Sequence, residues 1–419
     1  MGYLRRIQTV WLLAVVLGAM PAHAQMPLPV VDRPEDVGLS SSQLARVEAV
    51  TRQHIEAGLV PGAVMLVARQ GKIAWSQTMG YRDRGAGDAM RPDAIFRIYS
   101  MTKPIVSVAA MMLVEEGRMQ ISDPVAQFLP EIGNMKVGTE KTDAAGKTVL
   151  ELVEPTRPMT VQDLLRHTSG LIYGTRGSSL INAAYVDAKI GDRNATSEEF
   201  VSRLSRLPLR FSPGMRWEYG VSTDVLGRVV EVVSGKPLGA FLQERIFQPL
   251  GMVDTAFHVP ADKLARVAQP WQRPGSPPMT RRFDVAQAPR FESGGGGLTS
   301  TMADYLRFAL VLANGGELDG TRLLGRKTVE FMTADHATGI PGRPPGLGFG
   351  LGVEVRRVAG AASLPGSIGE YGWAGNAGTL FWIDPKEDLI AIYLVQVNDG
   401  DRIMLRNQFR TMVQAAIVD

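Results

Sequence analysis

The spacing of apolar residues predicts strands at both ends of the chain. Residues 63–80 contain two apolar runs separated by Gln70–Gly71, which is typical of two strands joined by a tight turn. Residues 41–57, just before them, carry apolar side chains at helical spacing and predict a helix. The C-terminal part changes character, and its pattern predicts antiparallel strands and a final helix within the following ranges: 346–358, 369–384, 389–397 and 403–417.

The middle of the chain has helical periodicity instead. A helix is expected from about Ser100 to Gly117, and another begins at Thr160, where T-x-x-D is a capping pattern. Further helices are expected at 221–235, 238–247 and 301–316, a hairpin at 136–153, and an irregular Pro- and Gly-rich stretch at 268–297. Strands at both termini with helices between them predict an α/β (α+β) fold with an inserted helical lobe. The expected lobes are 25–95 with 290–419, and 96–289.

Composition narrows the class of protein. The 419 residues are 45% apolar and 21% charged, which is ordinary for a globular chain. The formal charge is +3, and no block of basic residues stands out, which argues against nucleic acid or an anionic membrane as a partner. The chain has no cysteine, so a disulfide, a thiolate nucleophile and a Cys-based zinc site are excluded.

The first 24 residues have the order of a secretory signal peptide. Arg5 and Arg6 precede the apolar run VWLLAVVLGAM, and AHA at Ala22–Ala24 is a small-residue cleavage site. The alternative is a membrane anchor, but the run is well short of the ~20 residues that a spanning helix needs. We therefore expect cleavage after Ala24, no membrane insertion, and a periplasmic or secreted protein.

The stretch FRIYSMTKP places Ser100 and Lys103 one helical turn apart, at the start of an apolar helix. A lysine next to an apolar wall has its charged form disfavoured, which makes it a candidate base for the serine hydroxyl. The pattern S-x-x-K alone is weak, because about one match is expected by chance in a chain of this length. It gains weight only if other parts of a serine-hydrolase site are present.

Other candidate motifs have ordinary structural explanations when taken singly. No G-x-S-x-G or H-E-x-x-H occurs, and a structural hydrogen bond is the favoured role for His167 in RHTSGL. Tyr219 follows a Pro–Gly turn and, taken alone, reads as a core tyrosine with a bonded hydroxyl. The stretch YGWAGNAGT at 371–379 reads as a strand with a packed bulge, where small residues let the backbone approach a ligand closely.

Taken together and in order, these segments resemble the serine β-lactamase and penicillin-recognising enzyme superfamily, and most closely its family VIII carboxylesterases. The segments that carry the resemblance are FRIYSMTKP, LLRHTSGL, PGMRWEYG, DVLGRVVEVVSGKPL, PLGMVDTAF, GGGGLTSTMADYLRF and GWAGNAG. They cover nearly the whole chain after the signal segment. The resemblance implies a β-lactamase/transpeptidase-like fold, with an antiparallel sheet flanked by helices, a helical lobe and an active site between the two.

The resemblance also implies roles for particular residues. Ser100 becomes the nucleophile, Lys103 its base partner, and Tyr219 the tyrosine of the second motif, which relays the proton to the leaving alcohol. The backbone N–H groups of Ser100, at a helix N-terminus, and of Asn376 would form the oxyanion hole. No metal or organic cofactor is implied.

Two positions depart from the lactamase pattern. Trp373, in the third motif Trp373–Ala374–Gly375, stands where lactamases have a lysine, and Val221 stands where they have an asparagine. Trp373, Gly375 and Val221 are the expected substrate contacts. Both replaced groups would normally hold the carboxylate or the amide of a β-lactam.

The expected function is therefore an exported serine carboxylesterase that hydrolyses small, short-chain esters through an acyl-serine intermediate. One rival is a β-lactamase or D-alanyl carboxypeptidase on the same scaffold. A second rival is an inactive relative that only binds peptidoglycan or a partner, against which the intact Ser100, Lys103 and Tyr219 argue. The sequence does not specify the acyl and alcohol groups of the substrate or the oligomeric state. It also does not distinguish hydrolysis from acyl transfer.

Overall fold

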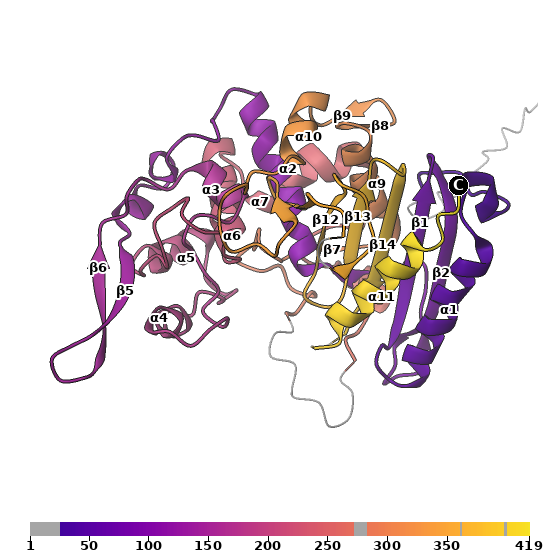
Figure 1. The fold of residues 1–419 in the computed structure, drawn as a ribbon, viewed down its shortest axis with the longest axis horizontal. Coiled ribbons are helices and arrows are strands. Elements are labelled where there is room, and N and C mark those ends of the chain that lie inside the picture. Colours follow the sequence, from indigo (N-terminus) through magenta and orange to yellow (C-terminus); the bar gives the residue numbers. More distant parts are fainter. Residues whose placement is uncertain (1–25, 272–282, 361–362, 398–399) are drawn as a thin grey trace, which may run out of the picture.

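A large antiparallel sheet and a group of helices form the fold. The computed structural model describes residues 26–271, 283–360, 363–397 and 400–419. The strands (Figure 1) are β1 (Gly62–Arg69), β2 (Lys72–Asp83), β3 (Asp88–Ala89), β4 (Phe96–Arg97), β5 (Val137–Thr142), β6 (Thr148–Val153), β7 (Thr299–Ser300), β8 (Glu317–Leu318), β9 (Thr321–Arg322), β10 (Leu347–Phe349), β11 (Glu354–Arg356), β12 (Tyr371–Ala374), β13 (Leu380–Asp384) and β14 (Leu389–Val395).

The helices lie on both faces of the sheet and in a separate group beyond it. They are α1 (Ser41–Glu56), α2 (Thr102–Glu115), α3 (Val161–Leu165), α4 (Leu180–Asp187), α5 (Ser197–Leu204), α6 (Ser222–Ser234), α7 (Leu238–Leu242), α8 (Gln248–Leu250), α9 (Met302–Ala313), α10 (Arg326–Met332) and α11 (Arg402–Gln414). In Figure 1 α1 and α11 lie on the outer side of the sheet, and the hairpin β5–β6 projects at the opposite end of the molecule.

The main sheet joins the two ends of the chain. Its strand order is β10-β11-β12-β13-β14-β1-β2-β3, and all neighbours are antiparallel. Strand β1 is buried along its whole length because alternate side chains enter two different cores. Val64 and Leu66 face the core around α2 and α9, whereas Met65 and Val67 face the core beneath α1 and α11. The sheet thus has helices on both faces, as the sequence predicts.

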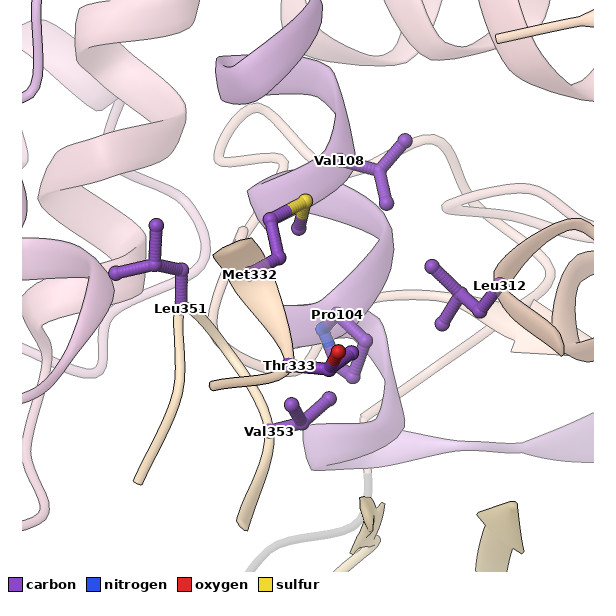
Figure 2. Close-up of a pocket in the computed structure, with 7 residues that line it drawn as sticks. All are labelled: Pro104, Val108, Leu312, Met332, Thr333, Leu351 and Val353. Atoms are coloured by element: carbon purple, nitrogen blue, oxygen red, sulfur yellow. The ribbon is translucent and has the colours of Figure 1, made fainter. Parts of the chain in front are cut away.

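Helix α2 is the central helix of the fold. Its side chains from Thr102 to Leu113 are all buried, including that of Lys103. A helix that is apolar on every side is stable only when it is enclosed on every side. Behind its first turn lies a small apolar void of about 10 Å³ (Figure 2), lined by Pro104, Val108, Leu312, Met332, Thr333, Leu351 and Val353. That volume is too small for a ligand, so the void is a packing defect of the core.

Most of the predicted elements are present. Helices α1, α2, α3, α6, α9 and α11, the β5–β6 hairpin and the C-terminal strands all lie where the pattern predicts them. The helix expected at 238–247 is present as α7, a π turn at Gln243–Phe247, and α8. Helices α4, α5 and α10 were not predicted. All strands of the main sheet fall within 62–89 and 347–395, and the exact lobe boundaries stay a prediction.

Two expectations concern residues outside the described part. The signal segment 1–24 lies there, as does 272–282 within the predicted irregular stretch. Among the residues that the structure describes, no helix is both long and apolar enough to cross a membrane.

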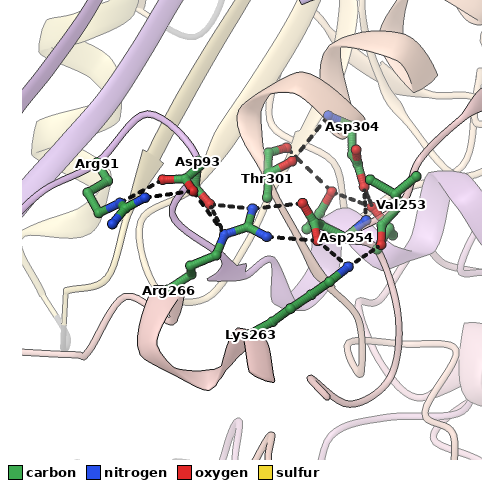
Figure 3. A network of polar contacts seen from close by, with 10 residues as sticks. Arg91, Asp93, Val253, Asp254, Lys263, Arg266, Thr301 and Asp304 are labelled. Carbon is green, nitrogen blue, oxygen red and sulfur yellow. Dashed lines mark hydrogen bonds and ion pairs between the residues drawn. The ribbon is translucent and has the colours of Figure 1, made fainter. Parts of the chain in front are cut away.

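A buried polar network connects the start of α9 to residues 254–266 (Figure 3). The Asp254 carboxylate accepts hydrogen bonds from Lys263 Nζ (2.8 Å) and Arg266 Nη2 (2.7 Å). The Asp304 carboxylate accepts from the Asp254 backbone N–H (2.7 Å) and from Thr255 Oγ1 (2.8 Å) through the same oxygen, Oδ2. The other oxygen, Oδ1, has no hydrogen-bond partner in the described part of the chain. Burial therefore raises the pKa of Asp304 to about 6.

This pKa makes stability depend on pH. The folded state binds the Asp304 proton more tightly than the unfolded chain does, so the contribution of Asp304 is greatest below pH ~4 and is lost as the pH rises through 6. Replacing Asp304 by asparagine removes the titration but keeps an acceptor oxygen. Between pH 4 and pH 8, the free energy of unfolding of Asp304→Asn should rise relative to wild type by roughly 2–3 kcal/mol.

Urea unfolding at both pH values measures this difference, and any pH-independent effect of the new amide cancels from it. Asp187→Asn, at an exposed position in α4, is the matched control and should follow wild type. A difference between Asp304→Asn and wild type that stays constant from pH 4 to pH 8 would contradict the assignment.

Candidate active site

The candidate nucleophile lies just before the central helix. Ser100 is in a 3-10 turn, Tyr99–Met101, and α2 begins at Thr102. Tyr99 has a φ of 44°, in the left-handed region, which is strained for a non-glycine residue. At the start of a helix the backbone N–H groups have no partner within the helix, and the N–H of Ser100 belongs to this set. Both the hydroxyl and the backbone N–H of Ser100 thus lie at the N-terminal end of α2.

Lys103 lies one turn further on and is completely buried. Its Nζ donates hydrogen bonds to Ser100 Oγ (3.4 Å), to Tyr173 Oη (3.1 Å) and to the carbonyl oxygen of Gly295. The ammonium also lies 4.7 Å from the centre of the Tyr219 ring. The predicted pairing of Ser100 with Lys103 is therefore present in the geometry. Tyr173 and Gly295 are contacts that the sequence did not reveal.

The protonation of Lys103 differs from the expectation. Burial opposes its charge, but the oxygens of Tyr173 and Tyr219 and the Asp224 carboxylate favour it, and together they raise the pKa of Lys103 above its usual value. Burial likewise raises the pKa of Tyr173, which keeps that hydroxyl neutral. These contacts favour the ammonium form of Lys103, which donates three hydrogen bonds, whereas its apolar sequence neighbours alone indicate a disfavoured charge.

A glycine-rich loop supplies the carbonyl that Lys103 contacts. Asp224, in the first turn of α6, accepts hydrogen bonds from the Gly295 N–H (3.0 Å) and from Ser293 Oγ (2.5 Å). A Cβ at position 295 would lie 2.3 Å from Asp224 Oδ2, so only glycine permits this approach. Asp224 thereby holds the loop against α6 and fixes the carbonyl of Gly295 over Lys103.

Tyr219 stands in a cluster of aromatic rings. Its ring centre lies 4.8 Å from that of His167, 5.5 Å from Tyr173 and 5.4 Å from Trp373. Its hydroxyl is buried and forms no hydrogen bond with the residues that the structure describes. The surrounding rings therefore fix the position of the Tyr219 side chain.

The role expected for His167 is wrong in its chemistry. Both ring nitrogens are buried without a hydrogen-bond partner in the described residues, and the ring packs edge-on against Phe349 (5.5 Å between centres). Burial, and then the charges of Lys103, Arg343 and Arg176, lower the pKa of His167 well below its usual value. His167 is therefore a neutral part of the aromatic cluster around Tyr219.

The third motif lies beside Ser100. A Cβ at Gly375 would lie 2.2 Å from the carbonyl oxygen of Ile98, two residues before the nucleophile, so the glycine permits close contact between the two segments. Arg406, on α11, donates a hydrogen bond to Gly378 O (3.2 Å) and another to Gly375 O. The guanidinium of Arg406 therefore holds the loop that contains Asn376 from outside.

These residues line one open cavity of about 510 Å³, which falls in the size range of sites for small molecules. Ser100, Tyr219, Trp373, Gly375 and Asn376 all contribute to its wall. Val221 does not: it is 5% exposed and packs in the apolar core, because the chain turns into α6 directly after it. In the described part of the chain there is no group of three or more His, Asp or Glu side chains that could hold a metal ion.

Comparison with known proteins defines the class to which this fold and site belong. The family model described as Beta-lactamase matches residues 47–413. Esterase EstB of Burkholderia gladioli is 33% identical over 380 residues, which are 85% of this chain and 91% of EstB. Protein Rv1367c of Mycobacterium tuberculosis is 37% identical over 366 residues, 83% of this chain and 89% of that protein.

Solved structures agree on the fold. The structure of EstCE1, described as a hydrolase with promiscuous acyltransferase activity, superposes with a TM-score of 0.75 at 26% identity and covers 90% of this chain and 99% of its own. Simvastatin synthase from Aspergillus terreus has the same fold, with a TM-score of 0.72 at 24% identity over 90% of this chain and 99% of its own.

The chain belongs to the Beta-lactamase family and has the serine β-lactamase-like fold. Within that superfamily it lies close to the family VIII esterases. It is a serine hydrolase of carboxylic esters.

Proposed function

We propose that this chain hydrolyses small carboxylic esters with short acyl groups, and that Ser100 carries the acyl group between the two half-reactions. The observation that supports this most is the hydrogen bond from Lys103 Nζ to Ser100 Oγ at the wall of the 510 Å³ cavity. Tyr219 lines the same cavity with an unbonded hydroxyl. Nucleophile, cation and proton carrier thus meet at one place, as acyl transfer to a serine requires.

In the first half-reaction Ser100 Oγ attacks the ester carbonyl carbon. The Ser100 proton passes to the Tyr219 oxygen, while the Tyr219 proton passes to the alcohol oxygen as its bond to the acyl carbon breaks. The N–H groups of Ser100 and Asn376 donate to the carbonyl oxygen, where negative charge develops. In the second half-reaction water attacks the acyl-serine, and its proton returns to Ser100 Oγ through Tyr219.

Lys103 acts in this scheme through its charge. An ammonium cannot accept the Ser100 proton, so the raised pKa of Lys103 directs that proton to Tyr219. The ammonium stabilises the partial negative charge on Ser100 Oγ and Tyr219 Oη during transfer. The resemblance implied that Lys103 is the base; we propose instead that it acts through its charge, as a member of the same catalytic set.

The third-motif wall favours an uncharged, short acyl group. The Trp373 ring packs against Phe349 (5.2 Å between centres) and Tyr219 (5.4 Å), so the side chain at this position of the third motif offers an apolar, uncharged surface. The test is one panel of substrates on the purified protein: an aryl acetate, the matching aryl octanoate and a chromogenic cephalosporin. We expect kcat/KM to be highest for the acetate, and highest turnover of the octanoate would contradict the short-chain assignment.

We also propose that the chain is exported and cleaved after Ala24. The support is the order of charged, apolar and small residues in the first 24 positions. Intact-mass analysis of the protein from the periplasm or medium should find a chain that begins at Gln25. A mass that includes Met1 on exported protein would contradict this proposal.

A further inference from the structure

The wall of the active-site cavity carries more positive than negative charge. Its two acidic residues, Glu354 and Glu370, are already bound by arginines: Glu354 by Arg343, and Glu370 by Arg356 and Arg410. Further arginines on the same wall are Arg176, Arg402 and Arg406, and none of these three forms an ion pair with a described residue. Among the described residues, the cavity wall therefore carries more cations than anions.

Arg176 is the one of these cations that lies over the catalytic tyrosine. Its guanidinium carbon is 4.9 Å from the centre of the Tyr219 ring and 5.6 Å from that of Tyr173. The side chain is exposed and forms no side-chain hydrogen bond with the described residues. Contact with ring faces holds a guanidinium but leaves the N–H donors at its edge unused. Arg176 therefore presents free donors at the cavity mouth next to Tyr219.

The loop that carries Arg176 is fixed from below. Asn182, which is 4% exposed, donates hydrogen bonds from Nδ2 to the carbonyl oxygens of Gly174 (3.1 Å) and Arg176 (2.8 Å). A Cβ at Gly174 would lie 2.9 Å from the backbone oxygen of Asn182, so the loop packs closely on α4. The same loop presents Tyr173 to Lys103. The backbone of Arg176 is thus held in place by Asn182.

We propose that Arg176 binds a carboxylate on the leaving alcohol of the substrate, so that the preferred substrates are short acyl esters of hydroxy acids. This inference rests on the proposed function, in which Tyr219 protonates the leaving alcohol. The group above Tyr219 is then the alcohol, and the free donors of Arg176 match the two oxygens of a carboxylate. The acyl group lies on the other side, against the uncharged Trp373.

Two acetate esters that differ only in charge test the inference. One is 4-acetoxybenzoate and the other is its methyl ester, so that the acetyl group is the same and only the leaving phenol changes. For each enzyme we take the ratio of kcat/KM for the charged ester to that for the neutral ester, corrected for the rates in hydroxide alone. Arg176→Gln should lower this ratio about tenfold, the effect of one charge-assisted hydrogen bond in a partly exposed site.

Two further measurements sharpen the test. The wild-type ratio should fall more steeply as salt is raised than that of Arg176→Gln, because the variant has lost one of the cations that attract the carboxylate. Arg290→Gln is the matched control: Arg290 is exposed near Glu199 (4.0 Å), and its ratio should equal that of wild type.

The outcomes separate the two proposals. If neither ester is hydrolysed, the proposed function fails. If both are hydrolysed and Arg176→Gln leaves the ratio unchanged, only the role of Arg176 is overturned. If Arg402→Gln lowers the charged-to-neutral ratio of kcat/KM and Arg176→Gln does not, the carboxylate binds at α11. That result would likewise overturn the assignment to Arg176.

Discussion

Replacement of Ser100 by alanine should lower kcat for an aryl acetate by about 10⁴-fold or more, to nearly the rate without enzyme. The hydroxyl that Lys103 contacts at 3.4 Å would be gone, and no acyl-enzyme could form. Substrate binding and the oxyanion-hole amides would remain, so only a small residual activity is expected. Retention of activity within tenfold of wild type would contradict the assignment of Ser100.

Helix α2, which follows Ser100, offers a matched control. Ser107 lies seven residues further along α2, is buried, and its hydroxyl has no hydrogen-bond partner among the described residues. Ser107→Ala makes the same chemical change in the helix that follows Ser100 and should keep most of the activity. Lys103→Met and Tyr219→Phe should each impair turnover severely, and a double variant should lose less than the product of the two effects, because the groups act as a unit.

Hydrolysis of the aryl acetate should exceed that of the cephalosporin by at least about 100-fold in kcat/KM. A lactamase grips the substrate carboxylate from the third motif, and a charge-assisted hydrogen bond of this kind is worth ~1.5–3 kcal/mol, or roughly 10- to 150-fold. Trp373 cannot form it. Val221 removes a second contact, because its side chain lies in the core and has no polar atom to offer.

This prediction assumes that no arginine outside the third motif replaces the missing lysine. Arg343 is bound to Glu354 and its guanidinium carbon lies 4.4 Å from the centre of the Trp217 ring, and Arg290 is near Glu199, so neither is free to replace the missing lysine. Arg176 forms no ion pair with a described residue and lies near Tyr219. Comparable kcat/KM for the cephalosporin and the acetate would mean that such a cation does replace it, and the lactamase alternative would then be the better account.

Much of the fold follows from local sequence. The turn between β1 and β2 has Gln70 and Gly71 at positive φ, as a two-residue hairpin turn requires. Thr160 caps α3 through the predicted T-x-x-D pattern. Helices α4 and α5 were missed although each begins with a capping box, Ser179 with Asn182 in α4 and Thr196 with Glu199 in α5.

In the candidate site, too, local contacts could be predicted from the sequence and contacts between distant segments could not. Ser100 and Lys103 share a face because they are one turn apart, and this spacing is visible in the sequence. Tyr173 and the carbonyl of Gly295 reach Lys103 from distant segments, and a backbone carbonyl has no residue signature at all. The raised pKa of Lys103 depends on Tyr173, Tyr219 and Asp224, and the apolar sequence neighbours of Lys103 indicate none of these contacts.

The sequence also does not show which side chain after Tyr219 faces the cavity. Sequence order places Val221 two residues beyond the tyrosine and predicts a substrate contact. In the structure Tyr219 lines the cavity, whereas Val221 packs in the core at the start of α6. Which side chain faces the cavity is decided by the direction in which the chain turns into the helix, and the residue types alone do not specify that direction.

Covalent labelling tests the central claim, that Ser100 is the acyl-accepting nucleophile. The purified protein is treated with an aryl phosphonate that reacts with activated serines, and its intact mass and the mass of its peptides are then measured. The account predicts one adduct per chain, on the peptide that contains Ser100, with matching loss of esterase activity and no adduct in Ser100→Ala. An adduct on another serine, or full labelling of Ser100→Ala, would contradict it.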